Sequence, residues 1–184
     1  MLMAKQSSTV KGANTFLISK HCHPQTIAVV EPRARAMGID IKLFAAESEL
    51  TGPGAFGLLL QYPHSNGDVI DYSDLIQKAK DQGLVVTMAC DLLALTLLKA
   101  PGELGADIAI GSSQRFGVPL GFGGPHAAFF ATRDEFKRRI PGRLVGSMSE
   151  ANLMTIVVFW TNTVWNTSKS PMARLISKRM TNVT

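Results

Sequence analysis

A run of sixteen residues, 111–126, holds five glycines and two prolines. Glycine lacks the Cβ that restrains the backbone and proline lacks an amide hydrogen, so neither a helix nor a strand tolerates this density of both. The run follows an apolar segment, 106–110, that predicts a strand. We therefore predict a shaped loop: its backbone approaches a ligand or another chain, unless its role is only structural.

Strand-like and helix-like segments alternate along the rest of the chain. The apolar segments that predict strands are residues 15–19, 39–45, 55–62, 84–90, 106–110 and 127–131. The segments that predict helices are 24–37, 71–82 and 133–139, with a short apolar helix or turn at 92–98. This alternation predicts an α/β fold, a three-layer sandwich with a mostly parallel sheet.

The strand and helix pattern alone also suits a flavodoxin-like receiver or half of a Rossmann fold. No G-x-G-x-x-G follows the first predicted strand, which argues against dinucleotide binding. No G-x-x-x-x-G-K-[ST] occurs, which excludes a P-loop.

The charge of the chain argues against a nucleic-acid partner. The formal net charge is +5, but residues 21–150 carry twelve Lys and Arg against all fourteen acids. The basic excess therefore lies at the two ends, which is typical of solvated tails rather than of a phosphate-binding face. No apolar run is long enough to span a membrane, so we expect no membrane partner.

The ends and the two cysteines give weaker signals. The first twelve residues are mostly polar, so they form no hydrophobic signal segment. With Lys5, Lys11 and no acid they weakly resemble a transit peptide, but we expect a frayed or initiator segment. Cys22 and Cys90 lie in apolar contexts, so we expect buried free thiols in a reducing compartment. We expect a bacterial cytoplasmic protein, or a mitochondrial one if the source is eukaryotic.

Ordered motifs through most of the chain resemble one family. They are Lys11-Gly12-Ala13-Asn14, His23-Pro24-Gln25-Thr26, Gly57-Leu58-Leu59-Leu60-Gln61-Tyr62-Pro63, Asp91-Leu92-Leu93-Ala94-Leu95, Pro101-Gly102-Glu103-Leu104-Gly105, the glycine-rich loop and Pro141-Gly142-Arg143-Leu144. Together they resemble the N-terminal half of the glycine cleavage system P-protein family. The resemblance implies part of the large domain of a fold-type-I pyridoxal-phosphate (PLP) enzyme.

The resemblance also implies an activity for the complete enzyme. The family decarboxylates glycine on PLP and passes the aminomethyl group to the lipoyl arm of H-protein. It implies three partners: a PLP-bearing C-terminal half, lipoylated H-protein and glycine. The N-terminal half is the non-catalytic counterpart of the C-terminal half, so this chain would scaffold the site and be inactive alone.

The cofactor lysine of such enzymes would lie just after the strand at 106–110. No lysine occurs between Lys99 and Lys137, and Gln114 and Arg115 stand in its place. Because a guanidinium stays protonated, it cannot form the imine, and we expect no covalent PLP in this chain. We identify no catalytic residue. A set of loop residues remains as a candidate interface with the active site: Ser112, Ser113, Gln114, Arg115, Gly123, Gly124 and His126.

Two further positions are candidate relics of a cofactor site. Asp91 ends a predicted strand, where the acid that holds the pyridine nitrogen would be, or it caps the segment after it. His23 lies where a ring-stacking histidine would be, or it begins the helix that follows. His21 and His23 have metal-like spacing, but no third ligand is near in the sequence, so we expect no metal site.

The chain changes character after Gly146. Residues 151–184 contain no acid and no glycine, and residues 154–160 form an apolar strand candidate. We expect three regions: an N-terminal segment with the first strand (1–20), a partial transferase-like domain (21–146) and a divergent tail (147–184). A shifted reading frame, a truncation or a genuine extension would each explain the tail. A stand-alone α/β binding module and a pseudogene product remain alternatives for the whole chain.

Overall fold

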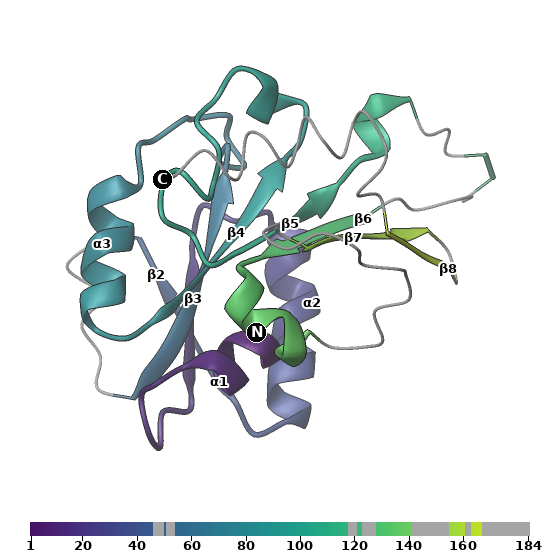
Figure 1. Cartoon of the computed structure of the whole chain (residues 1–184). Helices are drawn as coiled ribbons and strands as arrows, with labels where there is room; N and C mark the ends of the chain where they lie inside the picture. The colour runs from purple at the N-terminus through teal and green to yellow at the C-terminus, as the bar shows by residue number, and fades with distance from the viewer. Residues whose placement is uncertain are drawn as a thin grey trace. The chain divides into compact units, whose positions relative to one another are not determined.

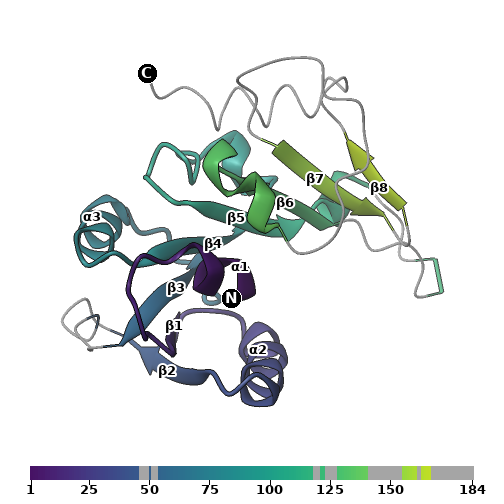
Figure 2. The ribbon, with the colours of Figure 1, turned by 60° about the horizontal axis from the view of Figure 1, so that its bottom comes forward.

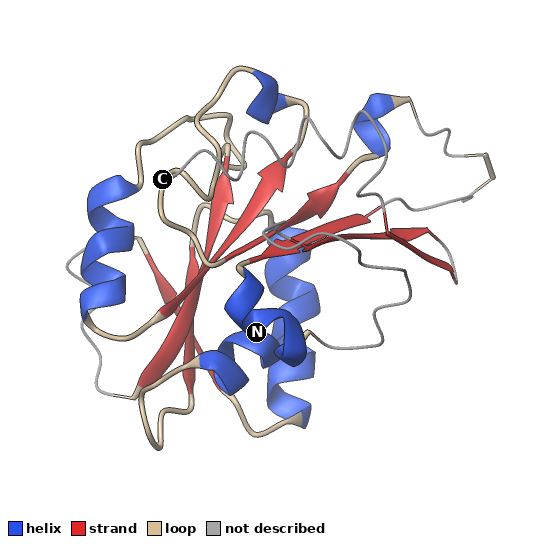
Figure 3. Ribbon diagram, viewed as in Figure 1, coloured by secondary structure: helices blue, strands red, loops and turns tan. Residues whose placement is uncertain are grey.

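The computed structural model describes residues 1–45, 50, 54–117, 121–122, 128–140, 155–160 and 163–166. The chain divides into two compact units, Met1–Ala89 and Cys90–Thr184. The first unit has an α/β arrangement, and the second consists mainly of β-strands. Figure 1 labels the helices and strands, and Figure 3 distinguishes strands, helices and loops.

The first unit is a parallel sheet with helices on both faces. Its strands are β1 (Thr15–Ser19), β2 (Asp40–Phe44), β3 (Ala55–Tyr62) and the start of β4 (Val85–Asp91), and they lie in the order β2-β1-β3-β4. Strand β1 pairs in parallel with both β2 and β3, with Phe16 opposite Ile41 on one side and Gly57 on the other. The parallel α/β architecture expected from the alternation is confirmed here.

Three helices cover the two faces of this sheet. Helices α1 (Leu2–Ser7) and α2 (Pro24–Ala36) lie on one face, and α3 (Ser73–Asp81) lies on the other (Figure 2). All eight residues of β3 are buried, as a central strand with helices on both faces requires. In α3 the buried residues Ile76 and Ala79 are three apart and so share one face of the helix.

The expectation of a frayed N-terminal segment was wrong. Residues Leu2–Ser7 form helix α1, and Met3 and Ala4 are buried. Helix α1 packs against β3, which lies far along the chain. A Cβ on Gly57 in β3 would stand 3.2 Å from the Ala4 Cβ and 2.7 Å from the Val85 carbonyl oxygen. A glycine in β3 therefore makes room for α1 to pack closely on the strand.

The second unit contains an antiparallel arrangement. It consists of β5 (Ile108–Ser112), β6 (Ala128–Thr132), β7 (Thr155–Trp160) and β8 (Thr163–Asn166), each antiparallel to the next. The strand expected at 154–160 is confirmed as β7. Single 3₁₀ turns η2 (Ala94–Thr96) and η3 (Gln114–Phe116) lie in its connecting segments.

The helix expected at 133–139 is instead a 3₁₀ segment, η4 (Asp134–Arg139). The sequence supplies no apolar stripe there, and Pro141 biases the preceding residue toward extended backbone. Ile140 indeed has φ −65° and ψ 127°, which ends the helical turn. The strand before it is anchored by Asp107, whose carboxylate pairs with Arg133 Nε at 3.3 Å and whose carbonyl accepts the Thr132 hydroxyl at 3.0 Å.

Two buried threonines give a matched test of this packing. The Thr87 hydroxyl on β4 has no hydrogen-bond partner within the described residues, whereas the equally buried Thr132 hydroxyl has one. We predict that Thr87→Val raises the free energy of unfolding by about 1 kcal/mol, because it removes an unsatisfied buried hydroxyl. Thr132→Val should lower it by about 1 kcal/mol or more. Urea denaturation of both variants measures this, and an equal effect of the two substitutions would contradict it.

Candidate functional site

Polar loop residues gather at the carboxyl ends of β1 and β3. From the end of β1 the chain turns to α2 on one face of the sheet, and from the end of β3 it turns to α3 on the other face (Figure 2). Adjacent parallel strands whose connections leave in opposite directions open a crevice between their ends. Open α/β sheets bind their ligands at such switch points.

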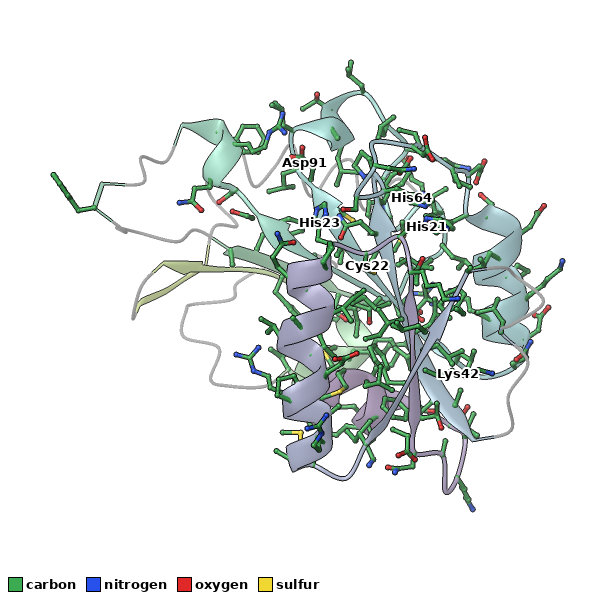
Figure 4. The ribbon with its side chains drawn as sticks, turned by 180° about the vertical axis from the view of Figure 1, so that it is seen from behind. His21, Cys22, His23, Lys42, His64 and Asp91 are labelled. Carbon is green, nitrogen blue, oxygen red and sulfur yellow. The ribbon has the colours of Figure 1, made fainter. Side chains whose placement is uncertain are left out.

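Two histidine rings stack at this switch point. The rings of His21, after β1, and His64, after β3, lie 4.3 Å apart between centroids and within 5° of parallel. His64 Nε2 makes a short hydrogen bond with the Tyr72 hydroxyl, which also lies 3.4 Å from the Gln61 carbonyl oxygen. The Ser65 amide donates to the His21 carbonyl at 3.0 Å, so the two loops are joined by backbone as well as by rings. Figure 4 shows His21 and His64 side by side.

Burial keeps His64 and Tyr72 uncharged near neutral pH. Only 4% of His64 is exposed, and burial lowers its pKa below the ordinary value, with His21 adding to the effect and Asp68 opposing it. Burial also raises the pKa of Tyr72, and the neighbouring Cys22 thiol adds to that shift. His64 is therefore a neutral imidazole and Tyr72 a protonated phenol.

Cys22 and His23 follow His21 in the sequence, but neither belongs to the stacked ring pair. Burial raises the pKa of Cys22 to about 12, and its sulfur lies 3.8 Å from the Leu59 carbonyl oxygen, so the thiol is protonated and unreactive. His23 is the N-cap residue of α2, and it is exposed with no side-chain capping bond. The structure thus places His23 at the start of the helix, apart from the stacked pair.

In the second unit, Asp91 and Arg115 form an ion pair. Asp91 ends β4, and its Oδ2 lies 3.1 Å from Arg115 Nη1 on the turn after β5. Asp91 Oδ1 accepts the Leu93 amide hydrogen at 3.0 Å. The carboxylate therefore has a guanidinium on one oxygen and a backbone donor on the other, and the positions expected for a cofactor acid and a cofactor lysine are bonded to each other.

The start of the glycine-rich run is more regular than its composition predicted. Gly111 and Ser112 belong to β5, and the Ser112 hydroxyl accepts the Gln114 amide hydrogen at 3.2 Å. A Cβ on Gly111 would stand 2.1 Å from the Cys90 carbonyl oxygen and 2.4 Å from the Phe129 ring, so only glycine fits there. Ser113 precedes the turn η3.

Other candidate residues of the run, Gly123, Gly124 and His126, lie outside the described residues. Within the described ranges, no three His, Cys, Asp or Glu side chains come together to hold a metal ion. None of the helices in those ranges has the length and apolar character needed to cross a membrane.

Sequence reasoning missed His64 and Tyr72. The signal was present, because His64 follows a predicted strand just as His21 does, and polar residues after parallel strands meet at one edge of a sheet. Tyr72 gave no such signal, since only the fold brings the start of α3 to the end of β3.

The parallel sheet and the polar residues at its strand ends define the class of this protein as an open α/β fold. Such folds bind ligands at the carboxyl edge of the sheet. The sequence model of the family described as "Glycine cleavage system P-protein" matches residues 1–159. The chain therefore belongs to the glycine cleavage system P-protein family.

Known relatives agree with this assignment. A glycine dehydrogenase (decarboxylating) of Thermosynechococcus vestitus is 59% identical over 152 residues, and one of Bordetella avium is 56% identical over 151. Each match covers 82% of this chain and 16% of the relative, so the chain spans about a sixth of their length. A crystal structure of glycine decarboxylase (P-protein) in inhibitor-bound form superposes with a TM-score of 0.71 at 30% identity, over all of this chain and 41% of that one.

Three substitutions separate the two contacts of Asp91. Asp91→Asn keeps an acceptor for the Leu93 amide and removes the ion pair, so we predict a loss in the free energy of unfolding below about 1 kcal/mol, as for other exposed pairs. Arg115→Met should cost the same small amount, because its side chain is 63% exposed. Asp91→Ala should cost about 1 kcal/mol more, since it also removes the acceptor of the Leu93 amide hydrogen.

Chemical denaturation of the three variants gives the comparison. Equal losses for Asp91→Asn and Asp91→Ala would show that the backbone contact contributes nothing and would contradict this account.

Proposed function

We propose that this chain is a segment of a glycine decarboxylase, from the half of the enzyme that carries no covalently bound PLP. The complete enzyme decarboxylates glycine and transfers the aminomethyl group to the lipoyl arm of H-protein. PLP bound in the C-terminal half supplies the electron sink for that chemistry. The identity to two proteins named glycine dehydrogenase (decarboxylating) supports the activity.

The observation that carries the cofactor-free assignment is the Asp91–Arg115 ion pair. The positive partner of the Asp91 carboxylate is already present in this chain, since Oδ2 lies 3.1 Å from Arg115 Nη1 and Oδ1 accepts the Leu93 amide hydrogen. An arginine cannot replace the lysine, because its guanidinium does not deprotonate. The residues at this sheet edge therefore do not fit PLP as a covalent cofactor.

Without a covalent cofactor of its own, the segment would support the active site of the complete enzyme and supply residues that line it. The candidate contacts to the PLP-bearing half are Ser112, Ser113, Gln114 and Arg115, with Gly123, Gly124 and His126 further along the run. Arg115 is well exposed at the end of β5, as a residue that faces a partner would be. We further propose a cytoplasmic location, which fits the two bacterial relatives.

Reduction with borohydride in the presence of PLP tests the assignment. We predict no stoichiometric pyridoxyl adduct on the intact chain, because no lysine lies between Lys99 and Lys137 to form one at this site. Mass spectrometry with peptide mapping reads the result, and the same treatment without PLP is the control. One adduct per chain on a single lysine would overturn the cofactor-free assignment.

A further inference from the structure

Two contacts join the loops that follow β1 and β3. The rings of His21 and His64 stack face to face, with their centroids 4.3 Å apart and their planes within 5° of parallel. Beside the rings, the Ser65 amide donates a hydrogen bond to the His21 carbonyl oxygen at 3.0 Å. The β1–α2 loop and the β3–α3 loop are therefore linked through a ring contact and a backbone contact at neighbouring positions.

The hydrogen bonds of Tyr72 determine which tautomer of His64 fits this arrangement. The Tyr72 hydroxyl donates its single proton to the Gln61 carbonyl oxygen, 3.4 Å away, and so it accepts from His64 Nε2–H. The other ring nitrogen of the neutral imidazole, Nδ1, then carries only a lone pair. This atom is buried and has no hydrogen-bond partner within the described residues. The closed arrangement of the loops therefore accommodates the neutral ring.

A second proton on His64 is unfavourable in the closed arrangement. It would lie on Nδ1, where the described residues offer no acceptor, and it would place a cation in a residue that is only 4% exposed. Burial lowers the pKa of His64, positive charge on His21 lowers it further, and the Asp68 carboxylate opposes the shift. In water Nδ1–H would find an acceptor, so the protonated ring is more stable when the loops are apart.

We propose that protonation of His64 separates the β1–α2 loop from the β3–α3 loop, so that the stacked histidines act as a pH-sensitive switch at the carboxyl ends of β1 and β3. When His64 is neutral, the rings stack and the Ser65–His21 hydrogen bond is formed. When His64 is protonated, its ring turns to solvent and that hydrogen bond breaks. The switch lies wholly within the first unit and does not depend on the proposed glycine decarboxylase activity, so its failure would leave that activity untouched.

The sign of the pH dependence follows from linkage. The groups that act on His64 are His21 from the β1–α2 loop, Asp68 from its own loop and Tyr72 from the start of α3. Burial raises the pKa of Tyr72 and of the neighbouring Cys22, so both stay protonated throughout. The closed state binds the His64 proton less tightly than the open state does. Opening therefore increases as the pH falls through the ordinary histidine range, by up to about tenfold for each pH unit.

Nuclear magnetic resonance of the intact chain tests the switch. The ring signals of His64 are titrated between about pH 8 and pH 5, and hydrogen exchange of the Ser65 amide is measured over the same range. We expect the protection of this amide, corrected for intrinsic exchange, to fall by about tenfold or more as His64 is protonated. Amides within β3 are the internal reference, and they should stay protected because the sheet remains folded.

Two variants and a control assign the effect to His64. His64→Phe keeps a ring that can stack on His21 but cannot be protonated, so protection of the Ser65 amide should no longer depend on pH. His21→Phe keeps the stacking and removes the charge beside His64, so the loss of protection should be smaller. His23→Gln removes an exposed histidine of the same loop that lies apart from the stacked rings (Figure 4), and it should behave as the native chain does.

Titration of His64 without loss of Ser65 protection overturns the proposal, because the closed arrangement then accommodates the protonated ring. An equal loss of protection at the β3 amides overturns it too, since the whole unit would then unfold. The same pH dependence in His64→Phe as in the native chain, or its disappearance in His23→Gln, also contradicts the switch. Should His64→Phe not fold, a loss of protection in His21→Phe as large as in the native chain decides against it.

Discussion

The structure of the first unit depends on the complete burial of β3. All eight residues of this strand are buried, which requires a strand on each side and a helix layer on each face. Burial of a leucine contributes about 2 kcal/mol, and Leu58, Leu59 and Leu60 lie in succession. Gly57 is the one residue in β3 without a side chain, and a Cβ there would meet both the Val85 carbonyl oxygen of β4 and the Ala4 Cβ of α1.

The same constraint determines where chemistry can occur. A strand buried along its whole length offers polar groups only at its ends, and β3 ends at Tyr62 with His64 just beyond. In the second unit, β4 and β5 likewise bring Asp91 and Arg115 to a strand end. The two units use their strand ends differently. One holds two stacked histidine rings, one of which has a buried nitrogen without a partner in the described residues, and the other holds an acid that contacts both a guanidinium and a backbone amide.

The sequence predicted those parts of the fold that depend on local pattern. The strands at 15–19 and 55–62 were predicted with the bounds that β1 and β3 have, because continuous apolar runs bounded by polar loops leave few alternatives. Helix α1 was missed because its stability comes from Gly57, which is distant in the sequence. The segment at 133–139 was taken for a helix because its length fits one, although it lacks an apolar stripe.

The candidate site could be predicted less well, for a related reason. Asp91 and Arg115 were each identified from the sequence, but their pairing follows from the packing of β4 and β5. His64 and Tyr72 can be recognised as site residues only in the structure, because both are buried and His64 stacks on His21. The regions proposed as 1–20, 21–146 and 147–184 remain a prediction, and the family match extends to residue 159.

Transplantation tests the central claim that this chain is a working segment of glycine decarboxylase. The aligned 152 residues would replace their counterpart in the Thermosynechococcus vestitus relative, and CO2 release from carboxyl-labelled glycine would be measured. The account predicts a chimaera that keeps its PLP and works within about tenfold of the parent, a difference of about 1.4 kcal/mol in the barrier. A folded chimaera that keeps its PLP but releases no CO2 would contradict the account.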